Sequence, residues 1–422
     1  MARQMKDSGI AWIGEMPEGW ELQKGKYLYR QRSEKGNSIE LQLLSPTQKY
    51  GVIPQSLYEK ISGMKPVQLD AKADLEQFKS IYARDFCISL RSFQGGFEYS
   101  QYNGVVSPAY QVFYRQSDTT YDAFYRYIFK EMGFIGYMNS FTKSFRDGKS
   151  IAFDDFAGTL LPVPPIAEQH RIAAFLDRRC AEIDAVIERT KATIEEYKKL
   201  KQAVITEAVT KGVRGERKMK DSGIEWIGEI PEEWEVLPHK YVMHKEKSIC
   251  EHYAGEDIIS LTMNGVIVRD LTAGGKMPTT FDGYQYVEPD DMLLCLFDID
   301  VTPRCVGIVR NHGVTSPAYS RFKVHVGYYN AYYDYLLRFI DDEKAFIHLS
   351  KNLRSSLTET DFGAIKTISP SYDEQVEIAA YLDEKCAALD TLIAKKTALL
   401  TELETYKKSL IYEYVTGKRE VQ

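Results

Sequence analysis

The chain has 422 residues, of which 44% are hydrophobic and 27% are charged, so it is long enough for two or three soluble domains. No apolar run reaches the roughly 18–20 residues of a membrane span, and the first residues lack the apolar core of a signal peptide. The six scattered cysteines include no CxxC pair, which predicts a cytoplasmic protein with reduced thiols and no membrane contact.

The formal charge of −6 is unevenly distributed along the chain. Residues 22–160 carry 18 Lys and Arg against 14 Asp and Glu, whereas residues 236–368 carry 14 against 17. Local basic faces are therefore compatible with the acidic total. The charge balance does not exclude a nucleic-acid partner.

The chain opens with an acidic, tryptophan-containing segment that recurs in its middle. Residues 5–21 read MKDSGIAWIGEMPEGWE and residues 219–235 read MKDSGIEWIGEIPEEWE, with identity at 14 of 17 positions. We call these two copies the openers. A long-range repeat of this kind predicts that the chain consists of two similar halves.

After the first opener, residues 1–21, the segment 22–161 is predicted to form a domain of mixed strands and helices. Strand-like runs at 85–90 and 110–114 precede a helical pattern at 121–132. Two polar loops, 89–100 and 142–150, offer the side chains that read base edges or contact phosphates, although an ordinary solvated loop is an equal alternative for any one residue. The candidate residues are Arg91, Ser92, Gln94, Lys143, Arg146 and Lys149.

A long helix is predicted within residues 162–212. Apolar residues recur there at heptad a and d positions, interrupted by Lys201, and proline-rich sequence precedes the pattern. A helix of about 40–45 residues is roughly 60–65 Å long, too long for one small domain to bury. The expected packing residues are Leu176, Cys180, Ile183, Ile187 and Ile194.

The second half repeats this order. A linker and the second opener occupy 213–235, a second body 236–368, and a second helix 369–422. Residues 374–391 match residues 168–185 at 10 of 18 positions, and TSPAY at 315–319 repeats VSPAY at 106–110. The two bodies otherwise share little. The packing residues expected on the second helix are Leu382, Cys386, Leu389, Ile393 and Leu400.

The second body is acidic, so a DNA-binding face on it would have to be locally basic. The loop at 349–362 aligns with 142–150, because both precede an Asp-Phe pair. The candidate DNA-binding residues of this half are Arg304, Arg310, Lys351, Asn352 and Arg354.

Two such helices in one chain most simply pack on each other as a coiled coil. An antiparallel pair is favoured, because a parallel pair would require the chain to return about 60 Å before the second body. The expected fold class is α+β: two globular mixed α/β domains joined by two long helices in an antiparallel coiled coil, with an internal pseudo-twofold repeat.

Several stretches of the sequence match known enzyme motifs only in part. SPAY resembles the tetrapeptide of amino-methyltransferases, but Ala109 and Ala318 replace its second proline, and no glycine-rich donor loop follows a strand. His244, Cys250 and His252 are close in sequence, yet the first half has no counterpart and no further ligand pair. The sequence therefore predicts a non-catalytic chain without a metal site.

Taken together, the two openers, SLRSFQGG with VSPAY, and PPIAEQHRIAAFLD with DEQVEIAAYLDEKCAALDTLI resemble the specificity subunit of type I restriction–modification systems. The resemblance spans essentially the whole chain. It implies two target recognition domains that each read one half of a bipartite double-stranded DNA sequence, with the helices as the spacer between them.

The resemblance also implies partners. Two modification (methyltransferase) subunits would dock on the repeated elements, with the opener tryptophans Trp12, Trp20, Trp226 and Trp234 as expected contacts. S-adenosylmethionine would be bound by those subunits, and no cofactor by this chain. Whether restriction (translocase and nuclease) subunits join the complex is left open.

The helices would then act as a ruler. About 60 Å corresponds to roughly 18 base pairs at 3.4 Å each, which leaves an unread spacer of about five to ten pairs. One alternative is a coiled-coil scaffold that joins two copies of a partner without DNA contact, and another is a stand-alone methyltransferase or nuclease, which the missing donor loop opposes.

Overall fold

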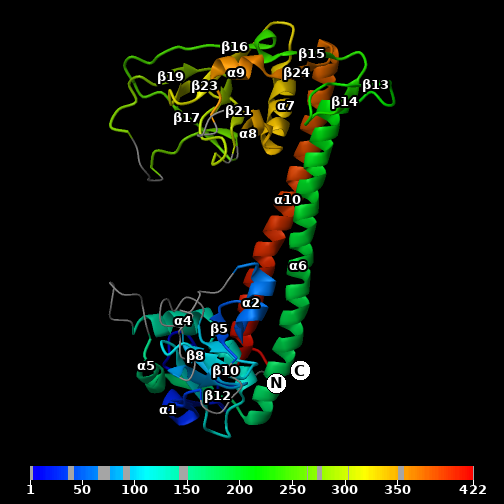
Figure 1. Ribbon diagram of the computed structural model, residues 1–422. Helices are drawn as coiled ribbons and strands as arrows, with labels where there is room; N and C mark the ends of the chain where they lie inside the picture. The colour runs from blue at the N-terminus through cyan, green and yellow to red at the C-terminus, as the bar shows by residue number, and fades with distance from the viewer. Residues whose placement is uncertain are drawn as a thin grey trace. The chain divides into compact units, whose positions relative to one another are not determined.

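The computed structural model describes residues 3–36, 42–64, 77–88, 96–141, 151–263, 265–272, 278–302, 304–349 and 356–421. Two compact units contain these residues, and both are seen in Figure 1. The first unit comprises Met1–Lys191 with Ala398–Gln422, and the second comprises Ala192–Thr397. Each long helix therefore contributes one part to each unit, rather than forming a segment of its own.

The first unit begins with the opener, whose strands β1 and β2 form an antiparallel hairpin. Strand β3 follows and pairs antiparallel with β12, the strand just before the first long helix. The body holds an antiparallel sheet in the order β4-β11-β8-β9 and two strand pairs, β5-β6 and β10-β7. The strands are β1 (Met5–Asp7), β2 (Glu15–Pro17), β3 (Glu21–Lys24), β4 (Tyr29–Gln31), β5 (Leu44–Thr47), β6 (Gly51–Pro54), β7 (Lys79–Ile81), β8 (Phe86–Ile88), β9 (Glu98–Tyr99), β10 (Gly104–Val106), β11 (Gln111–Arg115) and β12 (Leu160–Val163).

The second unit has the same plan. Its opener forms the hairpin β13-β14, and β15 pairs antiparallel with β24, which precedes the second long helix. The body holds the sheets β16-β23-β20-β21 and β18-β17-β22-β19. The strands are β13 (Met219–Asp221), β14 (Glu229–Pro231), β15 (Glu235–Pro238), β16 (Met243–Lys245), β17 (Ile258–Thr262), β18 (Gly265–Val268), β19 (Gln285–Val287), β20 (Met292–Leu294), β21 (Val306–Ile308), β22 (Gly313–Thr315), β23 (Ser320–Val324) and β24 (Lys366–Ser369).

The two bodies thus share a topology that their sequences barely show. The order β4-β11-β8-β9 corresponds strand for strand to β16-β23-β20-β21. Strands β10 and β22 also correspond. In β10 the Val105 N–H donates to the Gln42 carbonyl at 2.9 Å, and in β22 the Val314 N–H donates to the Asp257 carbonyl at 2.8 Å. The repeat therefore covers the bodies as well as the openers and helices.

The repeated SPAY segment is a turn between two strands. The Tyr110 N–H donates to the Ser107 carbonyl at 3.0 Å, and Tyr319 repeats this contact with Ser316 at 3.1 Å. A proline follows each serine, at the turn position that suits its fixed φ. A structural role accounts for this motif in both halves.

Short helices complete each body, and the predicted helical stretches are interrupted. The stretch at 121–132 ends as α3 at Ile128, and α4 begins at Met132, where the Glu131 side chain accepts the Phe134 N–H at 2.8 Å. The helices of the bodies are α1 (Gly25–Leu28), α2 (Gln55–Ser62), α3 (Asp122–Ile128), α4 (Met132–Asn139), α5 (Phe153–Gly158), the 3₁₀ turn η2 (His239–Tyr241), α7 (Asn330–Asp342), α8 (Ala345–Leu349) and α9 (Glu359–Ala364).

The long helices are α6, Ile166–Lys211 with 46 residues, and α10, Tyr372–Val415 with 44 residues. They pack together in each unit, as the heptad pattern predicts, so the expected α+β fold with paired long helices is confirmed. Of the expected packing residues, Leu176, Cys180, Ile183, Ile187, Ile194, Leu382 and Cys386 are buried, and Leu389, Ile393 and Leu400 are half-buried.

The lysines that interrupt both heptad patterns form equivalent ion pairs between the helices. In the first unit Lys407 Nζ lies 2.6 Å from the Asp184 carboxylate, and in the second unit Lys201 Nζ lies 2.7 Å from Asp390. Both pairs are largely exposed, so each contributes well under about 1 kcal/mol. These ion pairs fix the register of the two helices, because shifting either helix by one turn would separate each lysine from its aspartate.

Helix direction follows from contacts inside each unit. In the first unit Phe175 packs on Tyr414 with ring centroids 4.5 Å apart. Nine residues later along α6, Asp184 pairs with Lys407, which comes earlier in α10 than Tyr414. In the second unit Lys201 pairs with Asp390, and 13 residues later Arg214 pairs with Glu377, which comes earlier in α10 than Asp390. The helices are antiparallel in both units.

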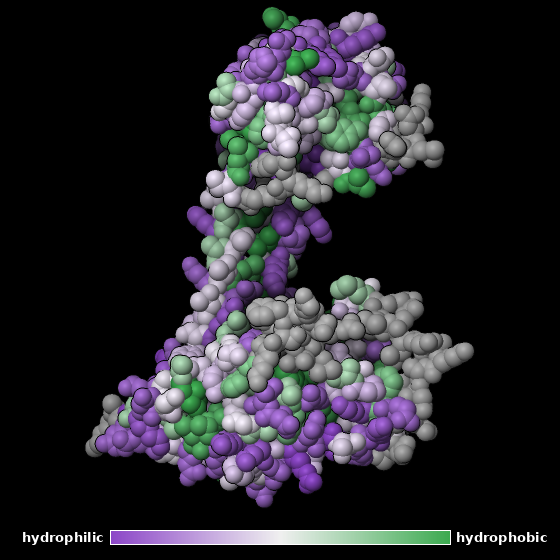
Figure 2. All heavy atoms as spheres, turned by 90° about the vertical axis from the view of Figure 1, so that its left-hand side faces the viewer, coloured by the Kyte–Doolittle hydropathy of each residue, from purple (hydrophilic) through white to green (hydrophobic). Residues whose placement is uncertain are grey.

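Hydrophilic side chains predominate on the visible face of each unit, and hydrophobic ones lie in patches between them (Figure 2). Among the described residues, no helix combines the length and the hydropathy that crossing a membrane requires.

Candidate functional site

The opener of the first unit is joined to the start of α6 by a buried polar contact. The Trp20 ring is 0% exposed, and its indole N–H donates to Glu168 Oε2 at 3.0 Å. Arg3 Nη1 lies 2.7 Å from the same carboxylate, and the guanidinium lies over the Trp20 ring at 5.4 Å. Glu168 is therefore buried with both its charge and its hydrogen bonds satisfied.

The second unit repeats this cluster. Trp234 is 1% exposed and donates its indole N–H to Glu374 Oε2 at 3.0 Å. Arg217 pairs with Glu374 and lies over the Trp234 ring at 5.5 Å. Opener and helix start are thus held by the same three side chains in both halves.

The far end of the other helix completes each cluster. Gly417, two residues after the end of α10, has a φ of +74° and lies against Pro17 and Trp20, where a β-carbon would collide with the proline ring. At the end of α6, Gly212 has a φ of +77° and lies against Trp234. We call each assembly of opener, helix start and opposite helix end a frame.

The repeated Glu-Gln pair that begins each helix also ties the frame to the body. Gln169 Oε1 accepts the Tyr121 N–H at 2.7 Å, and Gln375 Oε1 accepts the Tyr329 N–H at 2.7 Å. The sequence comparison contained these identities but gave them no role. The occurrence of the same pair at the same place near the start of both long helices was the sequence signal that could have indicated a structural role.

The four opener tryptophans, which were expected to contact a partner subunit, are buried or half-buried. Trp20 and Trp234 are core residues, Trp12 is 7% exposed and packs on Phe134 at 5.7 Å, and Trp226 is half-buried. Indoles buried in this way hold the frame together. The expectation that Trp20 and Trp234 are contact residues is therefore wrong, because both rings are buried within their own unit.

Residues 89–95 and 142–150 of the predicted recognition loops of the first unit lie outside the described residues, and with them the candidates Arg91, Ser92, Gln94, Lys143, Arg146 and Lys149. The segments that anchor these loops come together. Gly96 approaches the Phe129 carbonyl so closely that a side chain would not fit, and Phe97 packs on Phe134 of α4 at 5.6 Å. Ile151, just after the second loop, belongs to the same core.

A buried ion pair fastens the end of the first loop. The Glu98 side chain is 4% exposed, and Lys130 Nζ lies 2.6 Å from its carboxylate. Burial raises the pKa of Glu98 to about 7, and Lys130 opposes that shift. Lys130 also donates to the Gln48 carbonyl at 3.3 Å, so one side chain ties the loop anchor to the β5-β6 turn.

The predicted recognition loop of the second unit is also followed by an anchored segment. Lys351, Asn352 and Arg354 lie outside the described residues. The segment that follows them is bound to the loop after β20, because the Leu357 N–H donates to the Leu296 carbonyl at 2.8 Å. In both units, the segment that follows a predicted recognition loop is anchored to another part of the body.

The two remaining DNA candidates differ in their surroundings. Arg304 is half-buried, donates from Nε to the Met263 carbonyl at 3.1 Å and lies 3.7 Å from Asp342. Its guanidinium supports the loop in addition to any contact it makes with DNA. Arg310 is exposed just beyond β21, where its charge is available to a ligand.

The residues considered for a metal site have other surroundings. The His244 ring stacks on His325 with centroids 4.7 Å apart, and Cys250 is buried with a free thiol. In the described part of the chain, no group of three or more His, Cys, Asp or Glu side chains has the arrangement of a metal site.

A buried histidine of the second unit lies where η2 packs on α9. His239 is fully buried, stacks on Phe362 at 4.7 Å, and its Nδ1 lies 3.0 Å from the Ile365 carbonyl. Burial lowers the pKa of His239 to about 4 from its usual value near 6.5. The folded state therefore holds a neutral imidazole.

The pKa of His239 predicts acid sensitivity of the second unit. Between pH 6.5 and 4 the unfolded chain binds a proton that the folded chain excludes, so the free energy of unfolding falls as the pH falls, by roughly 3 kcal/mol in full. His239→Gln is expected to remove this dependence. The check is denaturant unfolding of both proteins at pH 7 and pH 4.5, with His170→Gln at an exposed position as control. An equal slope in all three would contradict the assignment.

These features define a class of fold: two mixed domains, each built on a frame and an antiparallel pair of long helices. The fold is that of solved type I restriction–modification subunits. A chain from a structure of complex assembly in a type I restriction–modification system matches with a TM-score of 0.71 at 14% identity, covering 96% of this chain and 99% of that one. The HsdS subunit of Thermoanaerobacter tengcongensis matches with a TM-score of 0.51 at 15% identity, over 96% and 98% of the two chains.

Sequence relatives carry the same name. A Methanocaldococcus jannaschii protein named for the MjaX type I restriction enzyme specificity subunit is 24% identical over 277 residues, 62% of this chain. The MjaVIII specificity subunit of that organism is 36% identical over 107 residues, and the Escherichia coli EcoBI specificity subunit is 28% identical over 124. The matched regions span 60%, 24% and 26% of those proteins. No protein-family model matches the chain. The chain is thus similar in sequence and in fold to type I restriction enzyme specificity subunits, as its motifs predicted.

Proposed function

We propose that this chain is the DNA-recognition subunit of a type I restriction–modification complex. Each body reads one half of a bipartite double-stranded DNA sequence, through the loops anchored beside β8 and α4 in the first unit and beside β20 and α8 in the second. The observation that carries the proposal is that like frames hold unlike loops: Trp20 with Glu168 is repeated by Trp234 with Glu374, whereas the predicted loop sequences differ.

The repeated frames fit a partner present in two copies. A protein surface that binds one frame will find a second frame of the same construction, as an internal repeat provides. We assign this partner as the modification subunit, which would bind S-adenosylmethionine and transfer the methyl group. This chain then supplies no catalytic group and acts by positioning the methyltransferase on DNA.

The long helices set the distance between the half-sites. Helices of 46 and 44 residues contribute to both units and are held in register by Lys407 with Asp184 in the first unit and by Lys201 with Asp390 in the second, which supports their proposed role as the spacer. The number of unread base pairs would follow from their length.

Genome-wide mapping of methylated adenines tests this proposal. Cells with and without the gene are compared while the modification subunit is expressed in both. A split sequence that loses methylation with the gene is expected, and it would give both half-sites and the spacer. Unchanged methylation would favour a scaffold that joins two partner copies without contacting DNA.

A further inference from the structure

Each unit has a cleft at the same place in its frame, beside the start of one long helix and the end of the other. The cleft of the first unit measures about 590 Å³ and that of the second about 680 Å³. Because the helical sequences repeat at an offset of 206, Phe175 of the first cleft corresponds to Tyr381 of the second. The two clefts therefore allow the lining residues and charges of the two halves to be compared position by position.

The cleft of the first unit is basic and has an aromatic floor. Phe175 and Tyr414 pack on each other there, with ring centroids 4.5 Å apart. Arg171 and Arg178 are exposed at its edge, and neither makes an ion pair with the residues that the structure describes. The charged residues lining this cleft are Arg171, Arg178, Arg419 and Glu420, and Arg419 is already engaged with Glu413 at 3.3 Å.

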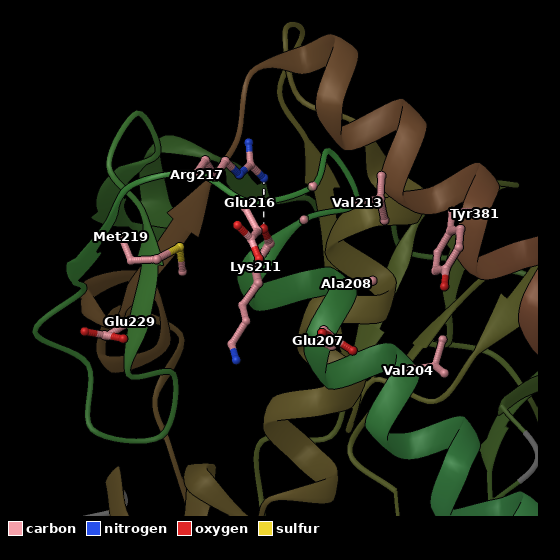
Figure 3. A pocket seen from close by; sticks show the side chains of 12 residues that line it. Val204, Glu207, Ala208, Lys211, Val213, Glu216, Arg217, Met219, Glu229 and Tyr381 are labelled. Carbon is pink, nitrogen blue, oxygen red and sulfur yellow. Dashed lines mark hydrogen bonds between the residues drawn. The ribbon is translucent and has the colours of Figure 1, made fainter.

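The cleft of the second unit is acidic and more open at its floor. Ala208 stands where the first unit has Tyr414, so the Tyr381 ring is left 36% exposed. In Figure 3 Tyr381 on α10 faces the side of α6 that carries Val204 and Ala208. The charged residues lining this cleft are Glu207, Lys211, Glu216, Arg217 and Glu229, and Arg217 is already engaged with Glu374.

The contrast extends to the helix surface beside the clefts. Arg171 and Arg178 on α6 correspond to Glu377 and Glu384 on α10, so the charge is reversed at both positions of an otherwise similar helix start. Glu377 is paired with Arg214 at 2.7 Å, and the exposed Glu384 lies 3.8 Å from the Lys385 Nζ. A protein contacting both frames meets two surfaces of similar shape and opposite charge.

We propose that the two frames bind their shared partner with unequal affinity, so that assembly passes through a complex with one partner copy. This inference rests on the proposed function, in which that partner is the modification subunit. An identical surface is attracted by one cleft and repelled by the other, because electrostatic match at an interface favours one sign of charge. Several exposed charges acting together give a difference of about tenfold in dissociation constant, equivalent to about 1.4 kcal/mol.

Native mass spectrometry tests the proposal on the full chain titrated with the modification subunit at low and high salt. At low salt the 1:1 complex is expected to accumulate before the 2:1 complex, with stepwise dissociation constants at least tenfold apart after statistical correction. High salt is expected to reduce that gap, because exposed charges are screened.

Arg171→Glu with Arg178→Glu gives the first frame the charges of the second, and is expected to bring the two stepwise constants together. Lys395→Glu is a matched control, since it makes the same kind of charge change on an exposed part of α10, 11 residues or about 16 Å from Glu384. It should leave the gap unchanged.

Equal constants in the wild-type chain, or an unchanged gap in the double variant, would overturn the inference. So would a double variant that assembles like the wild type but binds DNA more weakly, because the arginines would then belong to a DNA-backbone contact. If no modification subunit binds at all, the proposed function itself fails, and the inference with it.

Discussion

Replacing Trp234 with alanine is expected to destabilise the second unit by about 4 kcal/mol or more, while leaving the first unit near its original stability. The ring is 1% exposed, and truncating a buried tryptophan typically costs about 3–5 kcal/mol. The indole N–H to Glu374 is lost as well, which leaves a buried carboxylate with one partner fewer. Domains are stable by only about 5–15 kcal/mol, so the second unit would be largely unfolded at moderate temperature.

Hydrogen exchange measured by mass spectrometry would locate the effect. Amides of β24 and α7 should lose protection in Trp234→Ala, while those of β12 and α3 keep theirs, because the latter depend on the Trp20 frame. Trp20→Ala is the matched control and should give the mirror-image pattern. Trp234→Phe should cost much less, since most of the ring volume remains. Equal loss in both units from either variant would show that the frames are not independent supports.

Removing one heptad from both long helices is expected to shorten the unread spacer of the DNA target by about three base pairs and to leave the two half-sequences unchanged. Lys201 faces Asp390 in the second unit and Lys407 faces Asp184 in the first, so removing residues 188–194 from α6 and 397–403 from α10 shortens both helices equally between these two pairs. Deleting both stretches preserves the register of each unit. Seven residues shorten a helix by about 10 Å, and each base pair spans about 3.4 Å.

Methylome mapping reads out the spacer and both half-sites in the same experiment. Deleting residues 188–194 alone is the control, because it would leave Lys201 or Lys407 opposite the wrong residues and should abolish recognition rather than change the spacing. An unaltered spacer together with altered half-sites would refute the view of the helices as a ruler.

The openers and long helices could be predicted from sequence because they are repeats with local signals. Identity at 14 of 17 opener positions and the heptad spacing of Leu176, Ile183 and Ile187 are visible without coordinates. The antiparallel direction also followed from chain length alone, since a short linker cannot carry the chain back along a helix.

The shared topology of the bodies could not be predicted in the same way. Strands β8 and β20, only three residues each, pair with neighbours distant in sequence, and side chains of many kinds satisfy that pairing. Nor could sequence decide the role of the opener tryptophans. An aromatic residue in an acidic segment suits an interface or a core equally, and only the partner of its indole N–H, Glu168 or Glu374, distinguishes them.

The sequence by itself determined the two-fold repetition, the long paired helices and the kinship with specificity subunits, because each depends on residue identity or on short-range periodicity. The tertiary structure decided which repeated residues meet and which surfaces they leave exposed. Phe175 and Tyr381 align in the sequence repeat, but only the packing of α6, α10 and the openers places both of them in equivalent clefts. Contacts between residues far apart in the chain depend on geometry that no local pattern specifies.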